Sequence, residues 1–447
     1  MKTFKIGGIH PEENKLSAGK QIVDIPLPKQ VIIPLAAYIG APAAPIVAKG
    51  DKVKVGQLVG KANGFVSTNV HSSVSGTVAK IEDAMDASGY RRSSVFIDTE
   101  GDEWLETIDR TPDIKRDCAL SPEEIIAKIC DAGIVGLGGA TFPAHVKMTL
   151  PKGKKADLLI INAVECEPYL TCDHRLMLEH SEEILVGITV SMKAIGVKRA
   201  VIGIENNKPD AISLFNNQIQ KLSFKGIEVC PLKVKYPQGG EKQLIEAVTG
   251  RRVPSGALPI EVGAVVQNVG TSFAVYEAVQ KDKPLIERIV TVTGKSVSSA
   301  GNYRVRIGVT LLDVVNFAGG IPEDTGKYVA GGPMMGRAVA NLEIPTAKGS
   351  AGVLFIREGE AAHREMHNCI RCARCVKVCP MGLEPYLLMS LSENSLWERM
   401  ESERTMDCIE CGCCSYICPA NRTLLDYIRF GKSTVGNIIR NRNAKKN

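Results

Sequence analysis

Residues 369–380 read CIRCARCVKVCP, and residues 408–419 repeat the pattern as CIECGCCSYICP. Each run spaces its cysteines as C-x2-C-x2-C-x3-C and ends on a proline. Such short spacings let one loop wrap three thiolates around the irons of a [4Fe–4S] cluster, while the fourth cysteine reaches across to the other cluster. We therefore predict a helical, ferredoxin-like domain with two [4Fe–4S] clusters in this part of the chain.

The crossing of the fourth cysteines assigns two ligand sets. Cluster 1 is predicted to bind Cys369, Cys372, Cys375 and Cys418, and cluster 2 is predicted to bind Cys379, Cys408, Cys411 and Cys414. Cys413 lies beside Cys414, and we interpret it as a packing residue, although it could shift the ligand assignment by one position. The alternative is a pair of structural zinc sites, but zinc ribbons require neither the third cysteine of each run nor the repeated Cys-Pro ending.

Composition narrows the class of protein further. A chain of 447 residues has room for about three domains. Its net charge of +6 gives no support to nucleic-acid binding. The apolar run from Val31 to Ala48 contains Pro34, Pro42 and Pro45, which would leave backbone groups unsatisfied in a lipid-embedded helix. We expect irregular strands there, and no transmembrane helix in this chain.

The first hundred residues are predicted to be all-β, because short valine-rich runs alternate with glycine turns. Residues 49–57 (KGDKVKVGQ) and 74–78 (VSGTV) resemble the barrel-sandwich fold of biotinyl and lipoyl carriers. Those carriers need a lysine at the intervening hairpin tip, where this chain has residues 63–65 (NGF). A docking or scaffolding domain without a swinging arm is the expectation.

The pattern changes at Ser121, where a capping box with Pro122 begins a helix. Apolar runs at 157–163 and 199–204 then alternate with amphipathic segments at 208–222 and 241–249, which indicates an α/β layer structure. A predicted hairpin at 289–307 and a helix at 310–317 suggest a compact β-grasp-like (SLBB-type) unit, and one helix is expected near 384–400.

The fold class expected is therefore multidomain, α/β plus β. The predicted domains are a barrel-sandwich domain at 1–115, an α/β domain at 116–283, the SLBB-like unit at 284–350, the two-cluster domain at 351–432 and a frayed basic tail at 433–447. In that tail Lys445 and Lys446 add to the basic excess, which could also dock on an acidic partner or on lipid headgroups.

Five short motifs follow one another in the central region. They are residues 136–142 (GLGGATF), Lys147, residues 162–168 (NAVECEP), residues 236–241 (YPQGGE) and residues 267–269 (QNV). This ordered series resembles the FMN- and NADH-binding subunit of respiratory complex I. With the β-domain before it and the doubled cysteine run behind it, the whole chain resembles the C subunit of Rnf complexes, which are ion-translocating ferredoxin:NAD oxidoreductases. Residues 7–11 (GGIHP) are also similar to that family.

The resemblance implies three cofactors: FMN, NAD(H) and the two [4Fe–4S] clusters. It implies an FMN site made of Gly136, Gly138, Gly139, Lys147, Asn162, Glu165, Gly239, Gly240 and Asn268. For NADH it implies Phe142, Glu167 and Glu241, with no side chain acting as a catalytic acid or base. Leu137, Val164 and Gly240 depart from the complex I pattern, which has arginine, aspartate and glutamate at these three positions.

The function implied is electron transfer between NAD(H) and a membrane complex at the cytoplasmic face of a bacterial membrane. The other subunits of an Rnf-type complex would be the partners, with ferredoxin acting through them. A flavin is needed because nicotinamide exchanges a hydride whereas each cluster passes one electron. Two alternatives stay open at this point: a cobalamin reductase of a bacterial microcompartment, which would lack the N-terminal β-domain, and a cluster-bearing scaffold without nucleotide activity.

Overall fold

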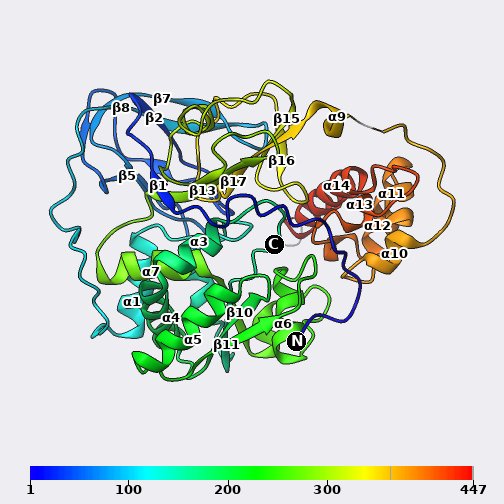
Figure 1. Cartoon of the computed structure of the whole chain (residues 1–447), viewed down its shortest axis with the longest axis horizontal. Coiled ribbons are helices and arrows are strands. Elements are labelled where there is room, and N and C mark those ends of the chain that lie inside the picture. The colour runs from blue at the N-terminus through cyan, green and yellow to red at the C-terminus, as the bar shows by residue number, and fades with distance from the viewer. Residues whose placement is uncertain (363, 445–447) are drawn as a thin grey trace.

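Four regions follow one another in the computed structural model, which describes residues 1–362 and 364–444 (Figure 1). The predicted all-β beginning is confirmed as two small sheets, ordered β2-β8-β7-β4 and β3-β5-β6. Their strands are β2 (Gln30–Pro34), β3 (Ala44–Pro45), β4 (Lys52–Val53), β5 (Leu58–Lys61), β6 (Val70–His71), β7 (Gly76–Met85) and β8 (Arg91–Thr99). The apolar run at 31–48 thus forms strands and loops, as its prolines predict. No helix within the two described ranges has the length and hydropathy needed to cross a bilayer.

The α/β region has one parallel sheet in the order β11-β10-β9-β12. Its strands are β9 (Leu158–Asn162), β10 (Ala200–Glu205), β11 (Ile227–Leu232) and β12 (Ala264–Asn268). The helices are α1 (Pro122–Asp131), α2 (Ala144–Met148), α3 (Cys172–Glu179), α4 (Ser181–Ile195), α5 (Pro209–Lys221), α6 (Glu241–Thr249) and α7 (Val269–Gln280), with a 3-10 turn, η1, at Pro259–Val262. Local signals are confirmed here: Ser121 and Glu124 form the capping box of α1, and α6 ends at left-handed Gly250.

The third region is a six-stranded sheet in the order β1-β14-β13-β17-β15-β16. It contains β1 (Ile22–Asp24), β13 (Glu287–Gly294), β14 (Gly301–Arg306), β15 (Thr325–Ala330), β16 (Arg337–Val339) and β17 (Gly352–Arg357), with helix α8 (Leu311–Phe317). The predicted hairpin is β13–β14. Two strands lie outside the predicted range 284–350: β17, which pairs with β13, and β1, which comes from the first twenty-odd residues. These two strands join the sheet by pairing with strands that are distant in the sequence, and such pairing leaves no local signal in the sequence.

The C-terminal region is a lobe of short helices (Figure 1). They are α9 (Glu358–Ala361), α10 (Arg374–Val378), α11 (Pro385–Glu393), α12 (Trp397–Ser402), α13 (Cys413–Tyr416) and α14 (Leu424–Ala444), with a 3-10 turn, η2, at Thr405–Asp407. The single helix expected near 384–400 is two helices, because Ser395 has the left-handed φ of 55° that ends α11.

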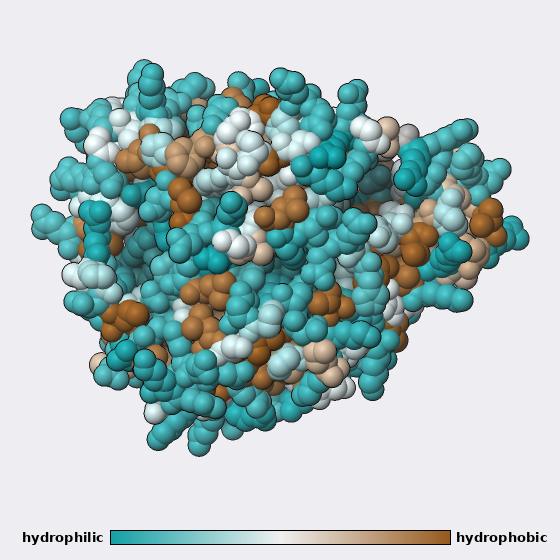
Figure 2. Space-filling model, viewed as in Figure 1, coloured by the Kyte–Doolittle hydropathy of each residue, from teal (hydrophilic) through white to brown (hydrophobic). Residues whose placement is uncertain are grey.

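The segment expected as a frayed tail from residue 433 is helical through Ala444, which corrects that prediction. Val435 is buried, and Gly431 lies so close to Met400 that a Cβ there would meet its sulfur at 2.4 Å. Packing of this face therefore holds the helix, although its sequence is basic. Lys445 and Lys446 of the predicted tail lie outside the described residues. Figure 2 shows a mostly hydrophilic face, with small groups of hydrophobic side chains spread over the main body and beside the C-terminal lobe.

Candidate FMN site and cluster cavity

Two asparagines lie side by side where neighbouring strands of the α/β sheet end. Asn162 ends β9 and Asn268 ends β12, and the two residues are paired in register. Asn162 Nδ2 donates to the Gly239 carbonyl at 2.8 Å, while Asn268 caps α7 by accepting from the Gly270 and Thr271 amides. Ligands of parallel α/β sheets bind at this edge, so the structure brings three predicted FMN residues to the expected place.

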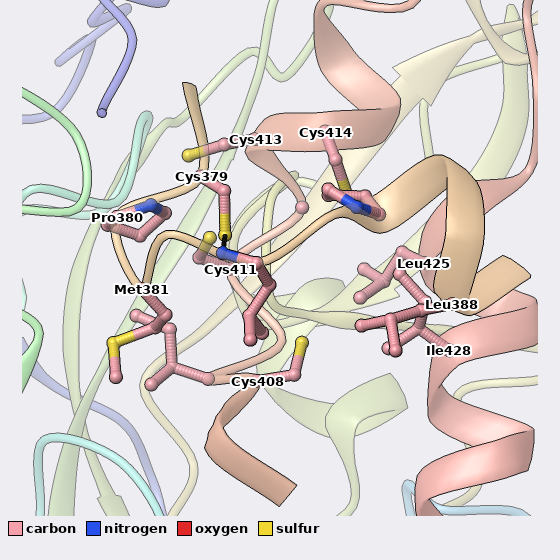
Figure 3. A pocket seen from close by; sticks show the side chains of 14 residues that line it. Cys379, Pro380, Met381, Leu388, Cys408, Cys411, Cys413, Cys414, Leu425 and Ile428 are labelled. Atoms are coloured by element: carbon pink, nitrogen blue, oxygen red, sulfur yellow. Dashed lines mark hydrogen bonds between the residues drawn. The ribbon is translucent and has the colours of Figure 1, made fainter. Parts of the chain in front are cut away.

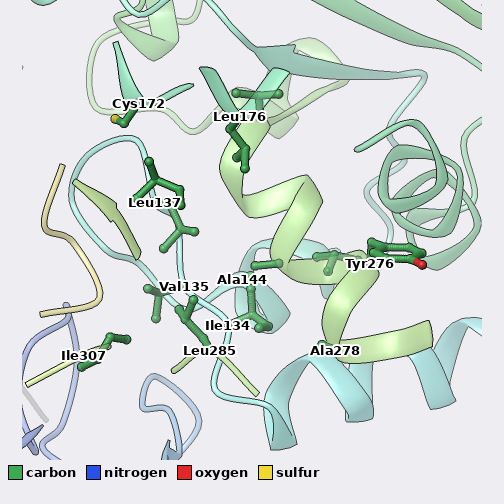
Figure 4. Packing of buried hydrophobic residues seen from close by; sticks show 14 of the residues in the cluster. Ile134, Val135, Leu137, Ala144, Cys172, Leu176, Tyr276, Ala278, Leu285 and Ile307 are labelled. Atoms are coloured by element: carbon green, nitrogen blue, oxygen red, sulfur yellow. The ribbon is translucent and has the colours of Figure 1, made fainter. Parts of the chain in front are cut away.

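The glycine-rich loop lies over this edge. The Leu137 amide donates to Thr271 Oγ1 at 2.9 Å, and Gly138 packs on Asn268 so tightly that a Cβ would meet its Nδ2 at 2.6 Å. Ile134, Val135 and Leu137 anchor the loop in the main hydrophobic core beside α7 (Figure 4). The Leu137 side chain is therefore a core residue, which explains why an apolar group is accepted where the complex I pattern has arginine.

Gly139 differs from its neighbour. A Cβ at Gly139 would meet no atom of the described residues within 4 Å, and the residue is exposed. The loop therefore has open space beside Gly139, whereas the preceding residue, Gly138, is packed against Asn268. This is the arrangement that a flat ring or a phosphate needs for close approach to a backbone.

Buried charges surround the loop after β9. Glu165, in the left-handed region with φ of 47°, accepts from the Asp173 amide at 2.7 Å and the His174 amide at 3.2 Å, so its carboxylate caps α3. Desolvation raises the pKa of Glu165 to about 7, against the opposing charge of Lys15. Lys208 Nζ donates to the Val164 carbonyl at 2.8 Å, and desolvation lowers the pKa of this lysine.

The buried carboxyl group of Glu205, at the end of β10, should make the free energy of unfolding depend on pH. Its side chain is 1% exposed, and desolvation raises its pKa from 4.5 to about 7. An acid whose pKa is higher in the folded state contributes stability below pH 4.5 that is lost as the pH rises through 7. The wild-type protein should therefore become less stable between pH 5 and pH 8. In Glu205→Gln we expect this drop in the free energy of unfolding to be smaller by about 3 kcal/mol. The measurement is denaturant unfolding at both pH values, with the exposed Glu228→Gln as the control that keeps the full pH dependence.

The predicted NADH residues already have protein partners. Glu167 Oε1 accepts from the Met334 and Met335 amides of the SLBB-like unit at 2.6 and 2.9 Å. Glu241, the first residue of α6, forms an ion pair with Lys147 Nζ at 2.6 Å. Phe142 is half-buried, and its carbonyl accepts from the Gly136 amide at 2.9 Å. The pair formed by Lys147 and Glu241 joins a predicted FMN residue to a predicted NADH residue.

The remaining predicted FMN residues, Gly239 and Gly240, precede α6. A Cβ at Gly239 would meet Cys166 Sγ at 3.2 Å, and the Gly239 amide donates to that sulfur at 3.3 Å. A Cβ at Gly240 would meet Gln243 Oε1 at 2.4 Å. The glutamate that the complex I pattern has at position 240 is thus replaced by a residue packed close to Gln243.

Sequence reasoning missed five polar residues of this site: Lys15, Asp173, Lys208, Tyr236 and Arg288. Asn268 Nδ2 donates to Asp173 Oδ2 at 2.7 Å, and Arg288 from β13 donates to the Ser350 carbonyl at 3.1 Å and to the Leu137 carbonyl at 3.5 Å. Tyr236 belongs to the motif at 236–241 and Lys208 follows the buried strand β10, so the sequence contained enough information to propose both as site residues. Lys15 and Arg288 carried no such signal, because they reach the site from distant segments.

The C-terminal lobe contains a cavity lined by cysteines. Cys379, Cys408, Cys411 and Cys414, the predicted ligands of cluster 2, border it together with Leu388, Leu425 and Ile428 (Figure 3). The sulfur of Cys413 lies 4.0 Å from the Tyr236 carbonyl oxygen, and its thiol also contacts that of Cys411. Cysteine sulfur and apolar side chains fit the donor set and the surroundings of an iron–sulfur cluster, and Cys379 from the first run lies among cysteines of the second.

The predicted ligands of cluster 1 lie nearer the surface. Cys369 and Cys372 are exposed, whereas Cys375 and Cys418 are half-buried. Desolvation raises the pKa of Cys375, and the Cys418 and Cys369 thiols contribute to this shift because they lie near it. The four residues are thus on the outer side of the lobe.

Comparison with known proteins matches four family models in one order along the chain. They are the RnfC barrel sandwich hybrid domain (residues 2–102), the Nuo51 FMN-binding domain (129–277), the SLBB domain (289–338) and the 4Fe-4S dicluster domain (362–419). The predicted fold class is confirmed by this order. Together with the sheet edge and the cysteine cavity, the matches define an electron-transfer protein that combines an FMN-binding domain with a two-cluster domain.

Whole-chain similarity gives the family. The chain is 46% identical to the C subunit of the proton-translocating ferredoxin:NAD(+) oxidoreductase complex of Clostridium ljungdahlii, covering 97% of this chain and 94% of that protein. It is also 46% identical to the C subunit of the Na(+)-translocating ferredoxin:NAD(+) oxidoreductase complex of Acetobacterium woodii, covering 97% of both proteins. The chain belongs to the family of C subunits of Rnf-type ion-translocating oxidoreductase complexes, which confirms the resemblance found in the sequence.

A solved structure shows the same fold over part of the chain. The NAD+-reducing [NiFe]-hydrogenase in the H2-reduced state matches with a TM-score of 0.51 and 20% identity, covering 70% of this chain and 63% of that chain. At this identity the likeness shows the fold alone.

Proposed function

We propose that this chain is the peripheral subunit that passes electrons between NAD(H), FMN, two [4Fe–4S] clusters and the other subunits of a membrane-bound, ion-translocating ferredoxin:NAD oxidoreductase. Membership of the family, at 46% identity over 97% of the chain, carries this proposal. The N-terminal barrel-sandwich match weighs against the cobalamin reductase alternative, and the FMN-binding match weighs against a scaffold without nucleotide activity.

The proposed FMN site is the space beside Gly139 at the carboxyl edge of β9 and β12. FMN, when bound, supplies the exchange between hydride and single-electron chemistry. The chain's residues bind and orient it: the glycine-rich loop admits the flat group, Asn162 and Asn268 offer polar contacts, and Lys147 offers a positive charge to phosphate. The residues proposed are those of the sequence prediction: Gly136, Gly138, Gly139, Lys147, Asn162, Glu165, Gly239, Gly240 and Asn268 for FMN, and Phe142, Glu167 and Glu241 for NADH.

The two cysteine sets give the proposed order of electron transfer. Tyr236, at the FMN side, donates from its hydroxyl to the Cys411 carbonyl at 2.9 Å, so cluster 2 would be the neighbour of the flavin. Cluster 1 would then exchange electrons with the next subunit, because Cys369 and Cys372 are exposed on the outer side of the lobe. The exposed Arg371, Arg374 and Lys377 in the first run favour an acidic surface on that partner.

We propose the cytoplasmic face of the membrane as the location, with attachment through partner subunits. NAD(H) and ferredoxin would then be accessible to the complex on that side. The domain boundaries proposed are 1–115, 116–283, 284–350, 351–432 and 433–447, with β1 and β17 joining the SLBB-like sheet.

Anaerobically purified protein tests the function directly. We expect about one FMN and about eight iron and eight sulfide per chain. NADH should bleach the flavin and then the cluster absorption. A colourless protein containing zinc, or one with clusters but no flavin and no response to NADH, would contradict the proposal.

Gly139→Ala tests the flavin position. Because no described atom lies within 4 Å of the added methyl group, the protein without flavin should keep its thermal stability. We expect FMN to bind at least about tenfold more weakly, since a methyl group in the path of the ring must be displaced or must push the ring away. Fluorescence titration of the apoprotein with FMN measures this, and unchanged affinity would place the flavin elsewhere.

A further inference from the structure

Residues 2–17 form a largely extended segment that precedes β1 and crosses the molecule. We call residues 2–17 the amino-terminal strap. Lys2 pairs with Leu232 at the end of β11, and Ile9 pairs with Tyr236 in the loop before α6. In Figure 1 the strap passes between the α/β region and the C-terminal lobe before it reaches β1. It therefore contacts both parts of the molecule to which cofactors are assigned.

Two glycines of the strap lie against the segment at 378–379, which carries the predicted cluster 2 ligand Cys379. The Gly8 amide donates to the Val378 carbonyl at 2.9 Å. At Gly7, with φ of 67°, an added Cβ would lie 2.6 Å from the carbonyl carbon and oxygen of Cys379. These are backbone atoms, so a side chain at Gly7 could be accommodated only by moving the strap away from a predicted cluster ligand.

Tyr236 links the strap to the other half of the same cavity. Ile9 and Tyr236 exchange two backbone hydrogen bonds of 2.8 and 2.9 Å, and the Tyr236 hydroxyl donates to the Cys411 carbonyl at 2.9 Å. Ile9, Tyr236, Cys411 and Cys413 form one buried hydrophobic cluster. Cys379 and Cys411 come from different cysteine runs; the strap lies against Cys379 directly and reaches Cys411 through Tyr236.

The other end of the strap holds the loop that carries Glu165. Lys15 Nζ donates to three carbonyls, those of Glu165 at 2.8 Å, Glu167 at 2.9 Å and Leu170 at 2.7 Å. The Tyr169 amide donates to the Glu13 carbonyl at 2.8 Å. A single run of nine residues, 7–15, thus contacts both the loop at 165–170 of the proposed flavin site and the segment at 378–379 that carries a predicted ligand of cluster 2.

We propose that the amino-terminal strap sets the position of cluster 2 relative to the flavin site, with Gly7 and Lys15 as positioning residues for the electron transfer between them. With both cofactors bound, NADH would supply the electrons, each transfer would take one electron from the flavin to the cluster, and the released protons would pass to solvent. The proposal rests on the proposed function and adds the element that holds its two cofactor sites together.

The experiment compares two variants with matched controls in the full-length, cluster-loaded protein. Gly7→Ala and Lys15→Met alter the two ends of the strap. Gly19→Ala and Lys20→Met are the controls, because a Cβ at Gly19 meets nothing within 4 Å in the described part of the chain and Lys20 is exposed. Stopped-flow absorption after mixing with NADH separates flavin bleaching from cluster bleaching, and iron and flavin contents normalise the rates.

We expect Gly7→Ala to bleach the flavin at the wild-type rate and the clusters about tenfold more slowly, since a misplacement of about 1 Å can cost that much in a positioned reaction. Lys15 also holds the loop of the proposed flavin site, so for Lys15→Met the expected result is a ratio of cluster rate to flavin rate about tenfold below that of the wild type. Hydrogen exchange gives a readout independent of turnover. The amides of residues 376–382 should exchange faster in Gly7→Ala, and those of residues 166–170 should exchange faster in Lys15→Met. Both controls should match the wild type.

Wild-type cluster bleaching and exchange in both strap variants would overturn the proposal. If Gly7→Ala fails to fold, Lys15→Met decides the matter by the same two measurements. A wild-type protein that lacks flavin or clusters would instead refute the proposed function, so the two failures are distinguishable.

Discussion

Cys379→Ala is expected to reduce the iron and sulfide contents from about eight to about four per chain, because one cysteine of the cluster 2 set is lost. NADH should still bleach the flavin, while electron transfer to the rest of the lobe should fall by at least about tenfold, since the cluster nearest the flavin is missing. Iron and sulfide analysis with electron paramagnetic resonance of the NADH-reduced protein measures both effects.

Cys413→Ala is the matched control for this prediction. Cys413 is buried, as Cys379 is, but its sulfur lies 4.0 Å from the Tyr236 carbonyl oxygen and it is not in the proposed ligand set. We expect it to keep about eight iron atoms per chain. The opposite pattern, with iron retained in Cys379→Ala and lost in Cys413→Ala, would show that the ligand set is misassigned.

Lys208→Met is expected to lower the free energy of unfolding by about 3–5 kcal/mol at pH 8. Lys208 is 2% exposed and lies between Glu165 and Glu205, so its removal leaves carboxylates without their buried cation and the Val164 carbonyl without its donor. The loss should be smaller at pH 5, because the pKa values of Glu165 and Glu205 are already raised and protonation removes their charge.

Denaturant unfolding of the flavin-free protein at pH 5 and pH 8 measures this difference. Lys221→Met, at the exposed end of the helix α5 that follows Lys208, is the control and should change the unfolding free energy by less than about 0.5 kcal/mol. A loss of that small size for Lys208→Met would mean that the buried cation contributes nothing to the fold.

Local signals in the sequence predicted most elements around the site. The capping box at Ser121 begins α1, Gly250 ends α6, and the apolar runs before Asn162 and Glu205 are strands β9 and β10. These predictions succeed because caps and buried strands depend on residues that are close in the chain. The break at Ser395 and the helical end of α14 were not predicted, because packing against other helices decides them.

For the candidate site, the sequence predicted which residues would take part, and the structure showed which other residues they contact. Asn162, Asn268 and Gly239 meet as expected from the order of motifs. The ion pair of Lys147 with Glu241 and the bonds of Glu167 to the SLBB-like unit were not foreseeable, because each joins segments that are far apart in the sequence.

The amino-acid sequence by itself determined the chemistry of this protein: two cysteine runs whose spacing fits two clusters, and a series of glycine and asparagine motifs that marks its family. These are short-range patterns, so they can be read along the chain. Only the tertiary structure decided which groups face one another, such as the strap against Cys379, Arg288 against the Leu137 carbonyl, and Lys15 against the loop at 165–170. Contacts of this kind join residues that lie far apart along the chain, and they form only when the whole core is packed.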